Sequence, residues 1–487
     1  MIKIPGENHW LKNQAELYGG SPALICEGNV ISYSELLKQS CRIAAILKLN
    51  KIEEGEPVGI LLGHSKKFVK IINALWFIGA LPVPLNSRNS VGENFSALNF
   101  LKSRFLITDL KGIDRRSGNG INVIDVDGND FNDLGESNLE TNSIFDINNN
   151  SLILFTSGST GKPKAVVHTF KSLYESVLTT DSFSGLTRDD LWLASLPFYH
   201  IGGFMILIRS LLAGSAVVIP ESINFSGISE ALTFYNPTHI SLVSTTLKQL
   251  LDKRVSPNKK LKCVYLGGGP LDTNLCREAL INGFPVIKVY GSTETCSMVC
   301  ALSTEQFIDK SDSAGRPVGN NKIKIIDAGG NECPEGQSGE ILIKCGSIFK
   351  EYYNNPEETG KKKIDSYYHT GDYGFTDGKG FLFVGPRKDD VIITGGENVN
   401  TKEVEQFIIQ LPSVIDAFVY SEKDPAWGDI ICAAVVTNKK TTSEEIRSQL
   451  KNMMASFKVP KRIYLVDKIP RNEIGKVERD KLNRSSG

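Results

Sequence analysis

The stretch that decides the fold is Ser151–Lys164, SLILFTSGSTGKPK, in which an apolar run leads directly into a loop of small and hydroxyl-bearing residues. Its first part, SLILF, is a continuous apolar run, which is typical of a strand covered on both faces. The glycines of the loop allow the backbone to approach an anion closely, while its hydroxyl groups and lysines can contact phosphate oxygens. The stretch therefore predicts a buried strand that ends in a phosphate-binding loop.

The loop differs from a P-loop in its spacing. Gly158 and Gly161 are too close together for that motif, and Pro163 stands where a magnesium-binding hydroxyl is needed. A flexible Ser/Gly turn with no ligand remains an alternative for the isolated motif. The candidate phosphate-binding residues are Thr156, Ser157, Gly158, Ser159, Thr160, Gly161, Lys162 and Lys164.

Short apolar runs alternate with amphipathic segments through the first two-thirds of the chain. One such segment begins with the capping box Ser32-x-x-Glu35 and continues with Leu36, Ile43 and Leu47 on one helical face. This alternation predicts an α/β fold with parallel, doubly wound sheets. The expected strands are Pro57–Gly63, Phe105–Thr108, Ser151–Thr156, Ser215–Pro220, Ile240–Val243, Lys262–Leu266 and Val286–Tyr290.

A second domain is predicted beyond the charged segment that follows Gly385. Helices are expected over Thr401–Leu411 and from the capping box at Thr442, with strands at Val414–Tyr420 and Ile430–Val436 between them. We therefore expect an N-terminal domain over residues 1–385, a hinge over 386–390 and a C-terminal domain over 391–487.

Composition and charge restrict the possible partners. The 487 residues carry 55 Lys and Arg against 55 Asp and Glu, so nothing favours a nucleic-acid partner or an acidic membrane surface. The N-terminus lacks the apolar segment of a signal peptide, and the apolar stretch Ile201–Pro220 contains Arg209 and three glycines, which indicates buried core. A cytoplasmic location without a membrane span is expected.

Four further motifs occur in a fixed order after the phosphate loop. They are Tyr290-Gly-Ser-Thr-Glu294 behind a strand, Tyr367–Asp372 (YYHTGD) with a carboxylate behind an expected tight turn, Arg387-Lys-Asp-Asp390, and Pro470–Lys476 (PRNEIGK). Each is commonplace alone. Together, over about residues 10–484, they resemble the adenylate-forming superfamily of acyl-CoA synthetases, luciferases and peptide-synthetase adenylation domains.

The resemblance implies a large N-terminal domain with mixed or parallel sheets and a β-subdomain, a small mobile α+β C-terminal domain, and an AMP-forming ligase. ATP would be bound with Mg²⁺, and the acyl group would pass to coenzyme A. By similarity the loop would grip the β- and γ-phosphates, Thr293 the α-phosphate and Glu294 the Mg²⁺. Asp372 and Arg387 would hold the ribose. Gly267, Gly268, Gly269, Pro270 and Tyr290 would form the adenine slot, and Gly291 and Ser292 would complete the nucleotide site.

The resemblance gives the C-terminal domain two roles. Lys476 would bridge the attacking carboxylate and the α-phosphate, although a solvated surface lysine is the alternative. Rotation about Asp389 would then bring Thr394–Asn398 to the site, with Gly396 leaving room for a pantetheine arm. Three positions depart from the usual pattern, which puts the rate of the rotation in doubt but removes no charged group. They are Pro386 for Gly, Thr401 for Pro and Ala165 for Gly.

The acid is expected to bind along Ser195–Gly203 (SLPFYHIGG), with Ser244, Thr245, Gly267–Gly269 and Gly291–Met298 completing the pocket. This run is most similar to that of the o-succinylbenzoate–CoA ligases of menaquinone biosynthesis, whose substrate carries a second carboxylate. His200 either closes the pocket or stacks on an aromatic acid, or it is a core histidine at a helix start. Arg209 lies nine residues after His200, which is two and a half helical turns, so the two side chains are about 180° apart around a helix. Arg209 is therefore a candidate for the second carboxylate only through a kink or as a group behind the pocket, and a structural ion pair is the alternative.

Three alternatives stay open. The chain could be a CoA ligase for another aromatic or medium-chain acid, an adenylating enzyme that loads a carrier protein, or a nucleotide-binding scaffold with relict motifs. Retention of the five charged groups argues against a scaffold; they are Lys162, Glu294, Asp372, Arg387 and Lys476. The expected partners are the acid, ATP and CoA, with no nucleic acid. Formation of a homo-oligomer is left open.

Overall fold

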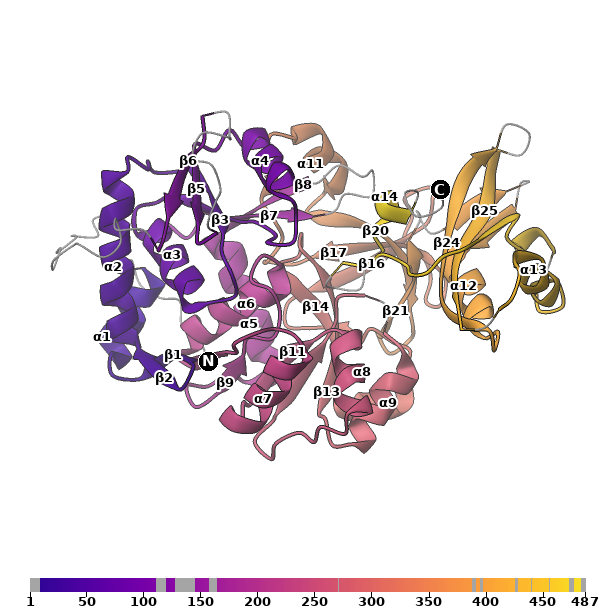
Figure 1. Ribbon diagram of the computed structural model, residues 1–487, viewed down its shortest axis with the longest axis horizontal. Helices are drawn as coiled ribbons and strands as arrows, with labels where there is room; N and C mark the ends of the chain where they lie inside the picture. The colour runs from indigo at the N-terminus through magenta and orange to yellow at the C-terminus, as the bar shows by residue number, and fades with distance from the viewer. Residues whose placement is uncertain are drawn as a thin grey trace. The chain divides into compact units, whose positions relative to one another are not determined.

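The computed structural model in Figure 1 describes residues 9–110, 120–127, 145–156, 164–269, 271–387, 391–394, 397–424, 428–438, 440–454, 456–472 and 477–482. These residues form two compact units. The first comprises the described residues up to 323 together with 343–368, and the second comprises 324–342 and the described residues from 369 onward. No helix among the described residues is long and apolar enough to cross a membrane.

A nine-stranded sheet forms the centre of the first unit. Its middle strands are parallel, while the outer pairs β1–β2, β13–β14 and β14–β15 are antiparallel. The order is β15 (Arg316–Pro317), β14 (Ser297–Leu302), β13 (Val286–Ser292), β12 (Cys263–Leu266), β11 (His239–Leu242), β9 (Leu191–Leu193), β10 (Ala216–Ile219), β1 (Pro22–Cys26) and β2 (Asn29–Ser32).

Both faces of this sheet are buried. On β12, Tyr265 belongs to the core cluster that also contains α5 and α6, and its neighbours Val264 and Leu266 are equally buried on the opposite face. Successive side chains of a strand point to opposite faces, so a wholly apolar strand needs cover on both sides. The prediction of a doubly wound α/β fold is confirmed. The helices of the first unit are α1 (Trp10–Tyr18), α2 (Tyr33–Leu49), α3 (Lys66–Phe77), α4 (Val91–Phe100), α5 (Phe170–Ser184), α6 (Ile201–Ala213), α7 (Phe225–Tyr235), α8 (Ser244–Asp252), α9 (Thr273–Ile281), α10 (Thr304–Lys310) and α11 (Pro356–Lys362).

Local signals place several of these elements as expected. Ser32 is the N-cap of α2, and its hydroxyl accepts a hydrogen bond from the Glu35 amide. The apolar segment after His200 is the buried helix α6 followed by β10, which confirms that it is core. The indigo helices α1 and α2 run side by side (Figure 1).

The remaining strands of the first unit form two smaller sheets. One is wholly parallel, in the order β4 (Leu81–Pro84), β3 (Pro57–Leu61), β5 (Phe105–Thr108) and β6 (Asn122–Asp125). The other is antiparallel, in the order β18 (Glu351–Tyr352), β8 (Lys164–Thr169) and β7 (Asn150–Thr156).

The apolar run Ser151–Thr156 forms a strand, β7, but this strand does not lie in a parallel sheet. In β7, Leu152 and Leu154 pack into one core cluster and Ile153 packs into another. Because both faces are buried, the run is continuous although its pairing with β8 is antiparallel. The assignment of this strand to a parallel sheet was wrong, since continuous hydrophobicity reports burial of both faces and not strand direction.

A five-stranded sheet, most of whose residues fall in the second unit, forms the predicted β-subdomain. Its order is β16 (Lys322–Ile326), β17 (Gly339–Lys344), β20 (Tyr367–Thr376) and β19 (Lys363–Ile364), with β21 (Leu382–Arg387) also pairing with β20. The antiparallel pairing of β20 with β21 is irregular between Asp372 and Gly374.

The C-terminal part of the second unit is an α+β structure. Its sheet has the order β23 (Glu397–Asn400), β22 (Val391–Thr394), β25 (Gly428–Thr437) and β24 (Val414–Asp424), with β26 (Arg462–Leu465) parallel to β25. Helices α12 (Thr401–Ile409) and α13 (Ser443–Lys451) share a core cluster with one face of this sheet, and Thr442 completes a capping box before α13. The short helix α14 (Arg479–Leu482) contributes Leu482 to a cluster on the other face. The boundaries 1–385, 386–390 and 391–487 stay a prediction.

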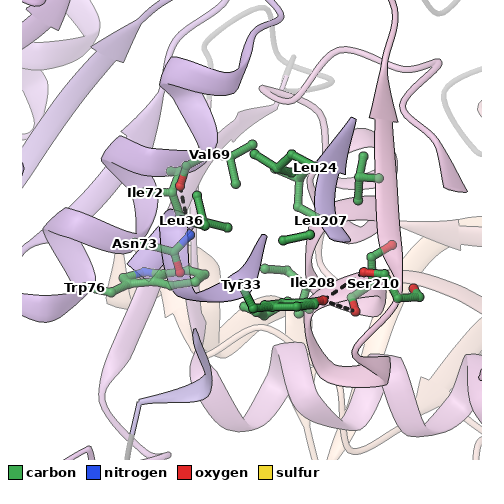
Figure 2. A pocket seen from close by; sticks show the side chains of 14 residues that line it. Leu24, Tyr33, Leu36, Val69, Ile72, Asn73, Trp76, Leu207, Ile208 and Ser210 are labelled. Carbon is green, nitrogen blue, oxygen red and sulfur yellow. Dashed lines mark hydrogen bonds between the residues drawn. The ribbon is translucent and has the colours of Figure 1, made fainter. Parts of the chain in front are cut away.

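The core of the first unit contains a small cavity of about 30 Å³ (Figure 2). The Tyr33 hydroxyl lies beside it, 2.8 Å from the carbonyl oxygen of Ser215, and the Asn73 amide donates to the Val69 carbonyl. None of the lining residues is a predicted site residue. The cavity is therefore a gap between α2, α3 and α6 and not the substrate site.

Burial of histidines makes the first unit sensitive to acid. Burial lowers the pKa of five of them from 6.5, to about 3 for His9 and to about 4 for His64, His168, His200 and His239. The unfolded chain then binds more protons than the folded chain between pH 6.5 and about 4. The contribution of these histidines to the free energy of unfolding is fully present above pH 6.5. It falls as the pH drops through this window, by up to about 1.4 kcal/mol per pH unit for each histidine.

Melting temperatures measured from pH 7 to pH 5 at constant ionic strength check this expectation. They should fall steadily toward pH 5, before carboxylates begin to titrate. His64→Gln, whose amide can still donate to the Ala194 carbonyl that His64 contacts at 2.8 Å, should make the profile less steep. A flat profile would show that the histidines take up protons freely in the folded state.

Candidate active site

Four segments predicted to bind substrates meet at one edge of the nine-stranded sheet. They follow β9, β11, β12 and β13, which are adjacent and parallel. The carboxyl ends of parallel strands lie at the same edge, where α/β sheets bind their ligands. The segments are Ser195–Gly203, Ser244 with Thr245, Gly267–Gly269, and the turn after Ser292. The fold thus brings the expected acid pocket and nucleotide site together.

The turn Thr293–Cys296 joins β13 to β14, and Gly291 stands just before it. A Cβ at Gly291 would lie 1.8 Å from the Ser297 carbonyl oxygen, closer than any side chain tolerates. The pairing of the two strands also shifts register between Tyr290 and Gly291. The glycine is therefore required by the close approach of the hairpin, a reason that the motif itself did not indicate.

Glu294 is half-buried, and within the described part of the chain its side chain has one hydrogen-bond partner. Its Oε1 accepts a hydrogen bond of 3.0 Å from the hydroxyl of Tyr352, a buried residue of β18. Burial and the adjacent carboxylate raise the pKa of Tyr352, so its hydroxyl stays protonated and donates. Among the residues that the structure describes, no ion pair includes Glu294. Carboxylate oxygens are ligands that Mg²⁺ prefers, so the chemistry of the predicted metal-binding residue fits this ion.

Lys164 begins β8 and lies beside the same tyrosine. Its ammonium group is 5.1 Å from the centre of the Tyr352 ring and is paired with Glu358 of α11. The hydrogen bond from Lys164 lowers the pKa of Glu358 below its ordinary value. Contact of Lys164 with a phosphate stays a prediction.

Asp372 and Arg387 are directly opposite each other in the pairing of β20 with β21. Asp372 is buried, and its backbone amide donates a hydrogen bond of 2.9 Å to the Thr370 hydroxyl. The prediction of a tight turn before Asp372 is wrong, because the strand β20 continues from Tyr367 to Thr376. The glycine of this motif, Gly371, instead takes a φ of 76° within the strand, beside the register irregularity.

His200 is the N-cap residue of α6 and is half-buried. Its ring lies edge-on to that of Tyr199, with 4.7 Å between the centroids. Burial, with a smaller effect of the Arg88 charge, lowers the pKa of His200 to about 4, so the imidazole is neutral at pH 7. Burial also raises the pKa of Tyr199, while Arg88 and Ser87 oppose the rise. Arg88 is thus a cation within electrostatic range of both rings.

Arg209 is buried behind the Glu294 turn. Its Nε donates to the Thr180 hydroxyl and its Nη2 to the Ser297 hydroxyl, both at 3.0 Å. Within the part of the chain that the structure describes, Arg209 forms no ion pair. Its guanidinium lies 5.8 Å from the Trp192 ring centre. The structural ion pair considered for Arg209 is therefore replaced by hydrogen bonds to hydroxyl groups behind the turn.

Several predicted residues lie outside the described part of the chain. Thr156 is described as the last residue of β7 and pairs with Lys164, whereas the rest of the loop is not. The predictions that lie outside are those for Ser157, Gly158, Ser159, Thr160, Gly161, Lys162, Pro270, Asp389, Gly396 and Lys476.

Three neighbours of the site had no signal in the sequence. Tyr352 contacts Glu294, and Arg88 influences His200. His64 stacks on Phe198 of the expected acid pocket, with 3.9 Å between ring centroids. No local signal could have suggested them, because His64 and Arg88 follow strands of the four-stranded sheet and Tyr352 belongs to β18 of the three-stranded sheet.

Two protein families match the chain. The AMP-binding enzyme family matches residues 11–353, and the AMP-binding enzyme C-terminal domain matches residues 403–476. The 2-succinylbenzoate–CoA ligase of Bacillus subtilis (strain 168) is 33% identical over 474 residues, which cover 97% of each chain. That of Bacillus cereus (strain ATCC 14579) is 31% identical over 98% of each.

Solved structures of related enzymes have the same fold. The O-succinylbenzoate coenzyme A synthetase (MenE) from Bacillus subtilis, in complex with ATP and a magnesium ion, matches with a TM-score of 0.90 and 32% identity, covering 97% of this chain and 99% of that one. ATP-bound MatB from Rhodopseudomonas palustris matches with a TM-score of 0.84 and 25% identity, covering 97% and 98%. The chain belongs to the AMP-binding enzyme family and is an adenylate-forming acyl-CoA ligase.

Proposed function

We propose that this enzyme activates 2-succinylbenzoate with ATP and transfers the acyl group to coenzyme A, a step of menaquinone biosynthesis. The observation that carries the proposal is identity of 33% with a 2-succinylbenzoate–CoA ligase across 97% of both chains. Similarity that extends over the acid-binding segments as well as the nucleotide motifs supports a shared substrate.

Adenylation joins two anions, the acid carboxylate and the α-phosphate of ATP, and so requires positive charge where the two meet. We assign Thr156–Lys164 to the β- and γ-phosphates and Thr293 to the α-phosphate. Glu294 would hold Mg²⁺, which neutralises charge on the phosphate oxygens when bound. The Tyr352 hydroxyl fixes one oxygen of this carboxylate and leaves the other for the metal.

The nucleoside would bind at the edge of the nine-stranded sheet. Gly267–Pro270, Tyr290, Gly291 and Ser292 follow or end the strands β12 and β13 and would enclose the adenine. Asp372 would accept hydrogen bonds from the ribose hydroxyls, with Arg387 assisting from the paired position on β21. An ionised carboxylate has two acceptor oxygens, so it can accept one hydrogen bond from each of two neighbouring hydroxyl groups.

The C-terminal domain would serve the two half-reactions in turn. Lys476 would bridge the acid and the α-phosphate during adenylation. Rotation about Asp389 would then withdraw this lysine and bring Thr394–Asn398 to the acyl carbon, with Gly396 lining the thiol channel. The proposed hinge segment Arg387–Asp390 is charged, and rotation about a short linking segment is a common route to such a rearrangement.

The acid would lie between the segments that follow β9 and β13. A neutral His200 can border an aromatic ring without repelling or attracting charge, and Phe198 stacked on His64 adds an apolar wall. The ring carboxylate requires a cation or several donors, because an unpaired carboxylate is costly to bury. Arg88, whose charge acts on both Tyr199 and His200, is our candidate.

The product test uses the purified protein with ATP, Mg²⁺, CoA and 2-succinylbenzoate. Mass spectrometry should detect 2-succinylbenzoyl-CoA, with one pyrophosphate released for each thioester. Benzoate, cinnamate and octanoate serve as competing acids. A higher kcat/KM for one of these acids than for 2-succinylbenzoate would show that the proposed substrate is wrong. Pyrophosphate release without transfer to CoA would favour a carrier-protein acceptor.

Lys476→Ala separates the two half-reactions. The variant should lose adenylate formation by about a hundredfold or more, because charge compensation at the α-phosphate is removed. Thioester formation from synthetic acyl-adenylate should continue at the wild-type rate. Lys481→Ala, which removes a nearby exposed lysine paired with Glu478, is the matched control. Equal loss in both half-reactions would contradict the assigned role.

Arg88→Gln tests recognition of the second carboxylate. The variant should lower kcat/KM for 2-succinylbenzoate about tenfold through a higher KM, the effect of one charge-assisted hydrogen bond. Activity with 4-oxo-4-phenylbutanoate, which lacks the ring carboxylate, should not change. Arg277→Gln, at an exposed arginine of α9, controls for the loss of charge. A similar loss with both acids would exclude Arg88 as the specificity group.

A further inference from the structure

The turn that carries Glu294, taken together with Ser297 at the start of β14 as Thr293–Ser297, is held by hydrogen bonds to five successive backbone carbonyl oxygens. Four of the donors come from other parts of the chain, and the fifth lies within the turn. The carbonyls and their donors are Thr293 with His168 Nε2 at 2.8 Å, Glu294 with the Phe349 amide at 2.7 Å, Thr295 with Ser347 Oγ at 2.9 Å, Cys296 with Ser176 Oγ at 2.5 Å, and Ser297 with Thr295 Oγ1 at 2.9 Å.

The backbone of this turn is strained. Cys296 has a φ of 55° and Ser297 a φ of 88°, so two adjacent residues with side chains lie in the left-handed region. Residues with a Cβ occupy this region at a cost in free energy, and they persist there only where the surroundings hold them. The turn therefore needs its external hydrogen bonds to keep this path.

His168 links the turn to the strand that follows the phosphate loop. It lies near the end of β8, fully buried, and its Nδ1 contacts the Ser172 hydroxyl at 3.1 Å. The Thr293 carbonyl can only accept a hydrogen bond, so Nε2 carries a proton and is the donor. Lys164, at the start of the same strand, borders the loop assigned to the β- and γ-phosphates.

Two buried serines hold the next carbonyls. Ser347 Oγ donates to Thr295, and Ser176 of α5 donates to Cys296. Behind them, Arg209 of α6 donates to the Ser297 hydroxyl. Donors from β8, α5, α6 and the segment after β17 thus converge on five residues. Such convergence fixes the direction in which the Glu294 side chain leaves the backbone.

We infer that His168, Ser176 and Ser347 are positioning residues, which fix the Thr293–Ser297 turn so that Glu294 is preorganised for a metal–nucleotide ligand. This inference rests on the proposed role of Glu294. Groups behind a metal ligand commonly change metal affinity by about 10–100-fold when they are removed, and a held carboxylate needs no rearrangement when the metal–nucleotide complex arrives.

The test measures binding of Mn²⁺ together with α,β-methylene-ATP by electron paramagnetic resonance, with no turnover required. His168→Leu and Ser347→Ala each remove one donor and should weaken Mn²⁺ binding about tenfold. His168→Gln, whose amide nitrogen can donate to the same carbonyl, should restore the wild-type affinity. In ATP–pyrophosphate exchange, the KM for metal–ATP should rise while the KM for the acid stays unchanged.

Ser103→Ala is the matched control. Ser103 is also buried, and its hydroxyl donates to a backbone carbonyl, that of Pro57, at 2.7 Å, but this bond joins the first residue of β3 to the segment just before β5. The control should lower the melting temperature as Ser347→Ala does and leave Mn²⁺ binding unchanged. Equal losses of Mn²⁺ affinity in Ser103→Ala and Ser347→Ala would overturn the inference.

Glu294→Gln separates failure of the inference from failure of the proposed function. If this variant binds Mn²⁺ weakly while His168→Leu and Ser347→Ala bind it as the wild type does, the positioning role is wrong and the role of Glu294 stands. If Glu294→Gln also binds Mn²⁺ normally, the assigned role of Glu294 fails, and the inference fails with it.

Discussion

The active site depends on one constraint, the parallel pairing of β9, β11, β12 and β13. Because these strands run in the same direction, the segments after their carboxyl ends are delivered to a single edge of the sheet. The expected acid pocket and nucleotide site, about a hundred residues apart in places along the chain, are assembled there. Burial of both faces keeps the strands in place, so the edge is a rigid base for the residues that it presents.

Glu294 shows how this base positions a single carboxylate. Gly291 allows the hairpin to close, and five carbonyl hydrogen bonds hold the turn that follows. The Tyr352 hydroxyl then orients the side chain itself. A carboxylate held in this way needs no rearrangement when the proposed metal–nucleotide ligand binds.

Much of the fold could be predicted because its signals are local. The runs at Phe105–Thr108 and Val286–Tyr290 became strands, and Ser32 and Thr442 became helix caps. Helix caps and apolar runs depend on interactions within a few residues, so they predict local structure independently of the tertiary contacts of the chain. The direction of β7 could not be predicted in this way, because its apolar run reflects two different cores on its two sides.

The sequence by itself determined the α/β class, the family motifs and the chemistry that their residue types allow. Only the tertiary structure decided which groups surround them. The bond from Tyr352 to Glu294 spans 58 residues and the pair between Lys164 and Glu358 spans 194, and the partners of Arg209 proved to be hydroxyl groups instead of a carboxylate. The physical reason is the distance along the chain over which each kind of interaction acts. Propensities and caps act along the chain, whereas the burial that shifts a pKa and the donors that hold a carbonyl come from segments brought together by packing.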